Sequence, residues 1–291
     1  MLRKGAMKKP LVSVLICTYN AEKTIHWALQ SVLDQTYDNL EVLILDNNSK
    51  DDTINLLDEY KEKDNRIKVF ALEKNLWAYG WLNYLLDKAK WDYIAIQDHD
   101  DVWHPTKIEK QIDFLEKNKD YIWSGSSYLE YYSWDKLWFV CDKDWWNSYR
   151  VNHTSLVFRN IWVKYDDKND YLCDIYFMRK ILCKDKKLLY IYPEVLSLHY
   201  FKKWGENYSN AWFKWSFSEI KKHFIVYGFW IYHILLFFYV YVKRLLPKKI
   251  QLWMSKILIR KVKWATDIKN LENDKNIYDM VKYINNKESN L

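Results

Sequence analysis

Short apolar runs alternate with helical patterns along the first half of the chain. Between these runs, apolar residues recur at helical spacing, as in Ile25, Leu29 and Val32. Strands that alternate with helices are typical of a parallel sheet with crossover helices. The pattern therefore predicts an α/β fold whose first strands are 11–17, 40–45, 67–72 and 93–97.

Residues at three points indicate where helices begin. Asn20 precedes the first helical pattern and can cap it. Ser49, with Asp52 three residues later, fits a capping box for a second helix. Pro105 suits the first turn of a helix whose inward stripe includes Ile108. We expect helices to start at these three places.

The second half of the chain has shorter elements. We expect aromatic-rich strands over 121–140, a helix over 170–182 and extended chain over 188–199. The remainder forms a helical region. The sequence thus divides into an α/β domain, 10–205, and a helical C-terminal region, 206–291.

Three polar clusters stand where predicted strands end. In an open α/β sheet, ligands bind outside the carboxyl ends of the strands, so these clusters line one shared crevice. They are Thr18-Tyr19-Asn20, Asp46-Asn47-Asn48-Ser49 and Asp98-His99-Asp100-Asp101.

The acidic cluster at 98–101 predicts a divalent cation. Carboxylates on one short turn repel each other unless a cation shares them, and oxygen is the ligand that Mg²⁺ or Mn²⁺ prefers. An alternative is that the acidic residues complement the dipole of the following helix. Asp46 has an alternative too, because it can simply organise the turn before Ser49.

Three segments resemble the successive nucleotide-sugar motifs of the inverting family 2 glycosyltransferases. They occur in the family's order and with similar spacing, and the resemblance covers roughly residues 10–205. The segments are VSVLICTYN (12–20), LDNNSKDDT (45–53) and IQDHDDVWHPTKIEKQ (96–111).

The resemblance implies a GT-A fold and a role for each motif. Thr18, Tyr19 and Asn20 would bind the nucleotide with Asp46, whose carboxylate would accept a hydrogen bond from the base. Asp98 would face the ribose. Asp100 would bind a Mg²⁺ or Mn²⁺ ion held on the diphosphate of the sugar donor.

The family also places a catalytic base near the start of a later helix, which implies Asp174. A carboxylate there would take the proton of the attacking acceptor hydroxyl, and displacement from the opposite face would invert the anomeric carbon. Where the family has an acidic residue just before the base, this chain has Cys173. Asp174 could instead be an ordinary acidic residue of a helix's first turn. His153 and His199 could contact the acceptor or be packed side chains.

Two other functions compete with sugar transfer. A sugar nucleotidyltransferase would need a glycine-rich phosphate loop after the first strand, and Thr18-Tyr19-Asn20-Ala21 is not one. A catalytically inactive, membrane-attached interaction protein would need neither the acidic cluster nor a base. Metal-dependent binding of a nucleoside diphosphate separates these alternatives.

The excess of basic over acidic residues lies in the C-terminal region. Residues 221–264 hold ten Lys and Arg and no Asp or Glu, although the whole chain carries only +7. They include a nearly continuous apolar and aromatic run, 224–242, which is borderline for a membrane span. We expect an anionic membrane surface as partner, bound by a peripheral or monotopic helix. A single span and a soluble interface helix are the alternatives.

This basic region also bears on partners and location. Nucleic acid is not an expected partner, because no recognised binding module accompanies the region. The 4 cysteines have no paired spacing, and the apolar run after the N-terminus is too short for a secretory signal. We therefore expect the cytoplasmic face of the cell membrane. The resemblance to family 2 glycosyltransferases, together with the basic region, implies a glycan or lipid-linked acceptor and a pathway of bacterial surface polysaccharide or lipid-linked glycan assembly.

Glycine and tryptophan occur in unusual numbers. The chain has 5 glycines and 17 tryptophans, whereas average usage gives roughly 20 glycines at this length. Trp91 follows a predicted helix, where a glycine cap is expected, and Trp134 lies between two predicted strands. The alternative is a genuinely tryptophan-rich protein. We hypothesise that many of these tryptophans are glycines in the native protein, because UGA codons were translated with the wrong genetic code. Among them are Trp77, Trp81, Trp91, Trp123, Trp134, Trp138, Trp162 and Trp204.

Overall fold

The computed structural model describes most of the first half of the chain and selected parts of the second. For 132, 137–141, 201 and 266–267 it describes the backbone alone. The described residues are 9–76, 80–132, 137–141, 152–159, 164–165, 177, 188–201 and 266–267.

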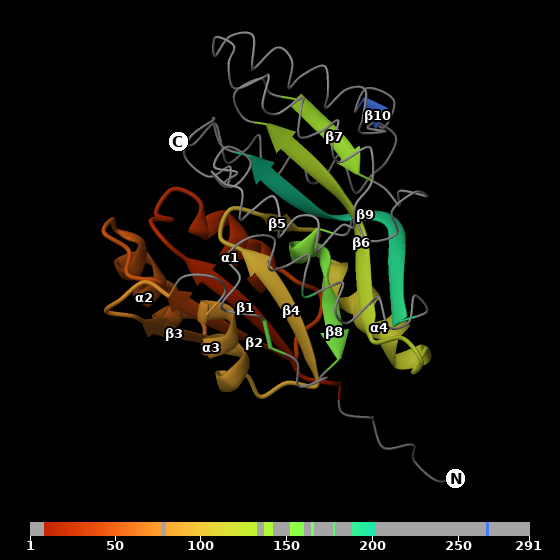
Figure 1. Cartoon of the computed structure of the whole chain (residues 1–291), viewed down its shortest axis with the longest axis horizontal. Coiled ribbons are helices and arrows are strands. Elements are labelled where there is room, and N and C mark those ends of the chain that lie inside the picture. The colour runs from red at the N-terminus through yellow and green to blue at the C-terminus, as the bar shows by residue number, and fades with distance from the viewer. Residues whose placement is uncertain are drawn as a thin grey trace, which may run out of the picture.

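Four parallel strands form the N-terminal half of the sheet, in the order β3-β2-β1-β4 (Figure 1). Because the chain moves outward from β1 to β3 and then returns to the other side of β1, the strand order reverses between β1 and β4. The strands are β1 (Val12–Thr18), β2 (Leu40–Asp46), β3 (Ile67–Ala71) and β4 (Tyr93–Asp98). The helices between them are α1 (Ile25–Leu33), α2 (Thr53–Lys63) and α3 (Gly80–Lys88).

The other half makes the sheet mixed rather than mostly parallel as predicted. β8 pairs antiparallel with β4 and with β6, while β9 runs parallel to β6. The alternation of strand and helix patterns predicts parallel pairing only for strands joined by crossover helices. It therefore did not predict the direction of the later strands. The remaining elements are β5 (Val102–Trp103), α4 (Lys107–Lys117), β6 (Trp123–Tyr132), β7 (Leu137–Cys141), η1 (His153–Ser155), β8 (Val157–Arg159), β9 (Leu189–Phe201) and β10 (Thr266–Asp267).

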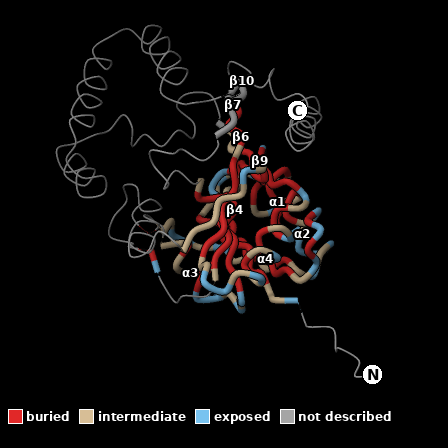
Figure 2. The backbone as a smooth tube through the Cα atoms, turned by 90° about the vertical axis from the view of Figure 1, so that its right-hand side faces the viewer, coloured by how far each residue is buried: buried red, intermediate tan, exposed pale blue. Residues whose placement is uncertain are grey.

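The sheet separates two apolar cores. One core packs β1 and β2 against α1, α2 and α4, with Val14, Ile25 and Ile108 fully buried. The other packs the opposite face against α3, through Leu82 and Leu85. Figure 2 shows α1, α2 and α4 on one side of the sheet and α3 on the other. The parallel strands, covered on both faces, are therefore apolar throughout, which fixes them in the interior.

The predicted helix starts need correction. Asn20 does not cap α1: its φ is 49°, and the helix begins at Ile25 after Thr24. The Ser49 capping box does not form, because α2 begins at Thr53 and the Ser49 hydroxyl turns back to Asp46. α4 begins two residues after Pro105. Asn20 and Ser49 thus belong to the turns that follow β1 and β2, and Pro105 lies in the turn that precedes α4.

The C-terminal region contributes one described element. β10 pairs antiparallel with β7, so residues 266–267 lie at the edge of the same sheet. The apolar run 224–242 lies outside the described residues, as does 170–182 except for Phe177. Within the described part of the chain, the helices are all too short or too polar to cross a membrane.

Three of the tryptophans proposed to be glycines have described side chains. Trp81 and Trp91 are half-buried and pack against the second core. Trp91 does not have the positive φ of a glycine cap, so that expectation is wrong for the backbone observed. Trp123 is fully buried and stacks on Phe158 with ring centroids 4.5 Å apart. Its indole N–H is buried and finds no acceptor among the described residues, which is unusual for an interior tryptophan.

Candidate functional site

The reversal of strand order brings the three predicted polar clusters to one edge of the sheet. Thr18, at the end of β1, pairs with Asp46 at the end of β2. On the other side, Cys17 of β1 pairs with Asp98 at the end of β4. The two carboxylates therefore flank the end of β1, at the point where this class of sheet binds ligands.

Asp46 organises the turn that follows β2. Its carboxylate accepts a hydrogen bond from the Ser49 amide at 3.0 Å and one from the Thr18 hydroxyl at 3.1 Å. The Ser49 hydroxyl donates to it as well. Asp46 is 4% exposed. The turn-organising role that the sequence allowed is confirmed, and a role in holding a base remains a proposal.

The segment after β1 lies against the same turn. The Asn20 amide donates to the Ser49 hydroxyl at 2.9 Å, and the Asn20 side chain accepts from the Lys50 amide at 2.8 Å. Asparagine tolerates the left-handed conformation that this approach requires. Tyr19, which precedes Asn20, is the most exposed large apolar side chain among the described residues, at 48%. Such a ring is available to stack on a planar ligand.

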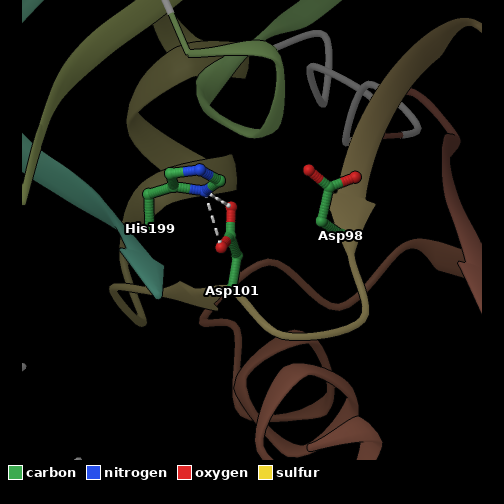
Figure 3. Close-up of side chains that lie close together, drawn as sticks. All are labelled: Asp98, Asp101 and His199. Carbon is green, nitrogen blue, oxygen red and sulfur yellow. Dashed lines mark hydrogen bonds and ion pairs between the residues drawn. The ribbon is translucent and has the colours of Figure 1, made fainter. Parts of the chain in front are cut away.

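The acidic turn after β4 contributes the strongest cluster of charge. Ligand atoms of Asp98, Asp101 and His199 lie within 4.8 Å of one another (Figure 3). Asp100 is 9% exposed and is not in this group. The two carboxylates suit Mg²⁺ or Mn²⁺, and the imidazole favours Mn²⁺, which as a transition metal accepts nitrogen more readily than Mg²⁺ does. The residues present therefore fit a divalent cation.

Strand pairing explains why His199 reaches the acidic turn. β5 follows the turn directly and pairs antiparallel with β9, with Val102 opposite Leu198. This register places Asp101 opposite His199, and the ring Nδ1 lies 2.8 Å from both carboxylate oxygens. Burial alone lowers the pKa of His199, but Asp101, with Asp100 and Asp98, raises it to about 9.

His199 is the residue whose place sequence reasoning missed. It was predicted only as a possible contact to the acceptor, and 98 residues separate it from Asp101. A histidine near the end of an extended segment was the only available signal. His153, the other candidate, is buried, and its Nε2 lies 2.6 Å from the Tyr165 hydroxyl. Burial lowers the pKa of His153 to about 3, so this ring is a neutral interior group. Asp174 lies outside the described residues.

Similar proteins share the sequence motifs and the fold. The profile of the family described as "Glycosyl transferase family 2" matches residues 13–175. A putative teichuronic acid biosynthesis glycosyltransferase, TuaG of Bacillus subtilis, is 39% identical over 122 residues, which cover 42% of this chain and 48% of TuaG. The Escherichia coli UDP-Glc:alpha-D-GlcNAc-diphosphoundecaprenol beta-1,3-glucosyltransferase WfaP is 42% identical over 120 residues, which cover 41% of this chain and 47% of WfaP. The match thus spans less than half of either relative.

Solved structures share the arrangement of the sheet. Residues 1–349 of Staphylococcus aureus TarS, in complex with UDP-GlcNAc, match with a TM-score of 0.56 and 19% identity, over 67% of this chain and 60% of that fragment. The mannosyltransferase PcManGT from Pyrobaculum calidifontis, in complex with GDP-Man and Mn2+, matches with a TM-score of 0.53 and 17% identity, over 68% of this chain and 59% of that chain. At these identities the likeness establishes the fold, a mixed sheet flanked by helices as in GT-A glycosyltransferases. With the family profile covering more than half of its length, the chain belongs to glycosyl transferase family 2.

Proposed function

We propose that the chain is an inverting glycosyltransferase that moves a sugar from a nucleoside diphosphate to an acceptor hydroxyl. The observation that carries the proposal is the edge of the sheet at the reversal of strand order, where Asp46 and Asp98 flank the end of β1. Membership in family 2 supports the reaction type. TarS and PcManGT have been crystallised with UDP-GlcNAc and GDP-Man, which supports a nucleoside diphosphate sugar as donor.

The nucleoside would lie across the ends of β1 and β2. Tyr19 offers an exposed ring for the base, and the turn held by Asp46 would fix the base edge. Thr18 and Asn20 hold that turn through hydrogen bonds, so their contribution is to shape the subsite. Asp98, half-buried at the end of β4, would face the ribose.

A divalent cation, Mg²⁺ or Mn²⁺, would be held beside the acidic turn by Asp100, as the family motif implies, together with Asp98 and His199 of the observed cluster. When bound, the cation stabilises the charge that develops on the leaving diphosphate. Through that cation, the carboxylates of the turn would hold the diphosphate at this edge of the sheet, although they would repel it without one. The complex of PcManGT with Mn2+ supports the choice of ion.

The proton of the acceptor hydroxyl would pass to the carboxylate of Asp174. A sugar hydroxyl is a poor nucleophile until a base within hydrogen-bond reach takes its proton. Attack from the face opposite the leaving diphosphate inverts the anomeric carbon. Asp174→Asn keeps the shape of the side chain but removes the base, so we expect turnover to fall by at least 100-fold with donor binding nearly unchanged.

A screen of nucleoside diphosphate sugars tests the proposal. We expect one donor to be hydrolysed or transferred with Mg²⁺ or Mn²⁺ and to be inert with EDTA. The matched control is Asp174→Asn, which should bind the same donor without turning it over. Formation of a nucleotide sugar from a sugar phosphate, or inertness toward every donor, would refute the proposal.

The pathway and the location are also proposals. The names of TuaG and WfaP support surface polysaccharide or lipid-linked glycan assembly, with a glycan or lipid-linked acceptor. The basic residues of 221–264 support attachment to the cytoplasmic face of the membrane. We expect the full chain to sediment with anionic vesicles and to be released in part by high salt. Sedimentation that is equal with neutral and anionic vesicles would argue against attachment by these charges.

A further inference from the structure

We propose that Asp101 is a positioning residue that orients the His199 ring toward the cation and does not itself bind the cation. The inference rests on the proposed function, because it assigns roles within the cation site described above. It separates the three clustered groups into two that face the ion, Asp98 and His199, and one that holds His199 in place.

Three donors engage the Asp101 carboxylate, and both of its oxygens accept hydrogen bonds. A carboxylate offers about four lone-pair positions. The His199 Nδ1 lies 2.8 Å from both oxygens, and the Thr154 hydroxyl donates to one of them at 2.8 Å. The Tyr200 amide donates to the other at 3.1 Å. A cation bound to Asp101 would have to share this carboxylate with the three donors or displace one of them.

The burial of the three side chains also favours a positioning role for Asp101. The side chain of Asp101 is 0% exposed, whereas that of His199 is 27% exposed and Asp98 is half-buried. Figure 3 shows Asp101 beneath the His199 ring, with Asp98 on a separate strand end beside them. The carboxylate that solvent does not reach is thus placed behind the histidine.

The chemistry of histidine ligands gives this arrangement a purpose. A histidine that binds a metal through one ring nitrogen usually donates the other N–H to a carboxylate, which fixes the ring and raises its basicity. Because Nδ1 is engaged by Asp101, Nε2 is the nitrogen through which His199 would bind the ion. The backbone amide of Tyr200 and the hydroxyl of Thr154 in turn hold the carboxylate.

Thr154 provides the most discriminating variant. Thr154→Val removes the hydroxyl that donates to Asp101 and keeps the shape of the side chain. If Asp101 positions His199, the variant lowers the affinity for Mn²⁺. If Asp101 were a ligand, losing a competing donor would leave that affinity unchanged or raise it. Ser155→Ala is the matched control, because the Ser155 hydroxyl belongs to the same turn but donates to the Asn152 carbonyl.

The experiment uses the full chain with Mn²⁺ and UDP or GDP, read by electron paramagnetic resonance. We expect a coupling from a directly bonded ¹⁴N nucleus in the wild type and its loss in His199→Gln. Asp101→Asn should weaken Mn²⁺ binding about 10- to 100-fold, and Thr154→Val should weaken it less. Absence of the nitrogen coupling in the wild-type complex, or Thr154→Val that binds Mn²⁺ as well as the wild type, overturns the inference.

A second measurement needs no metal. In the metal-free chain, a double-mutant cycle of Asp101→Asn and His199→Gln should show coupled shifts of the urea midpoint, because the two side chains are in direct contact. Independent shifts overturn the positioning role. A wild-type chain that binds neither Mn²⁺ nor nucleotide contradicts the proposed function instead, so the two failures are distinguishable.

Discussion

At the scale of single residues, the acidic turn shows how far a motif specifies a site. The run 98–101 predicted carboxylates at the sheet edge, and the structure places them there. The run does not say which carboxylate faces inward. That is decided by the register of β5 with β9, which buries Asp101 against His199. A contact between residues so far apart leaves no trace in local sequence.

His153 should make the stability of the fold sensitive to acid. Burial lowers its pKa from 6.5 to about 3. Between these two pH values the unfolded chain binds a proton that the folded chain does not, so the free energy of unfolding falls as pH falls. The loss is up to about 1.4 kcal/mol per pH unit. We expect His153→Gln to be less stable at pH 7 but to lose less on going to pH 5, as measured by urea unfolding. Equal losses in the two proteins would refute this.

The tryptophan positions make a prediction about the native protein. Average composition calls for more glycine, and the buried indole of Trp123 finds no acceptor among the described residues. The backbone at Trp91 offers no support, because its φ is not positive. We predict glycine at positions 77, 81 and 91 when the protein is isolated from its native source. Peptide mass spectrometry decides the question, and tryptophan masses at these positions would end the hypothesis.

At the scale of elements, Gln35 joins two helices that the sequence treats as separate. Its side-chain amide donates to the carbonyls of Ser31 in α1 and His104 before α4, both at 2.9 Å. Its carbonyl accepts from the Ile108 amide in the first turn of α4 at 3.0 Å. Because free backbone amides at a helix start need such a partner, the Gln35 side chain caps α4, a role that no pattern in the sequence predicted.

We expect Gln35→Ala to lower the free energy of unfolding by about 1–3 kcal/mol, because it leaves buried backbone groups without partners. Gln30→Ala is the matched control. Its side chain bonds Asp34 at the surface of the same helix, so we expect a much smaller change. Chemical denaturation of both variants measures the difference, and equal effects would contradict the bridging role.

At the scale of the whole molecule, the sequence predicts the part of the fold that depends on patterns between neighbouring residues. The four parallel strands and the helices between them follow from apolar runs such as 40–45 and from helical periodicity. The mixed half was not predicted, because pairing such as that of β8 with β4 depends on contacts across the sheet. The antiparallel pairing of β10 with β7 likewise joins segments that are far apart in the sequence.

The edge of the sheet at the end of β1 is proposed to bind a nucleoside diphosphate through a divalent cation. Isothermal titration of the full chain with UDP and with GDP, in Mn²⁺ and again in EDTA, tests this claim directly. We predict binding of at least one nucleotide in Mn²⁺ and its loss in EDTA, with Asp100→Ala reproducing the loss in the presence of Mn²⁺. Equal affinity in Mn²⁺ and in EDTA, or no binding of either nucleotide in Mn²⁺, would contradict the claim.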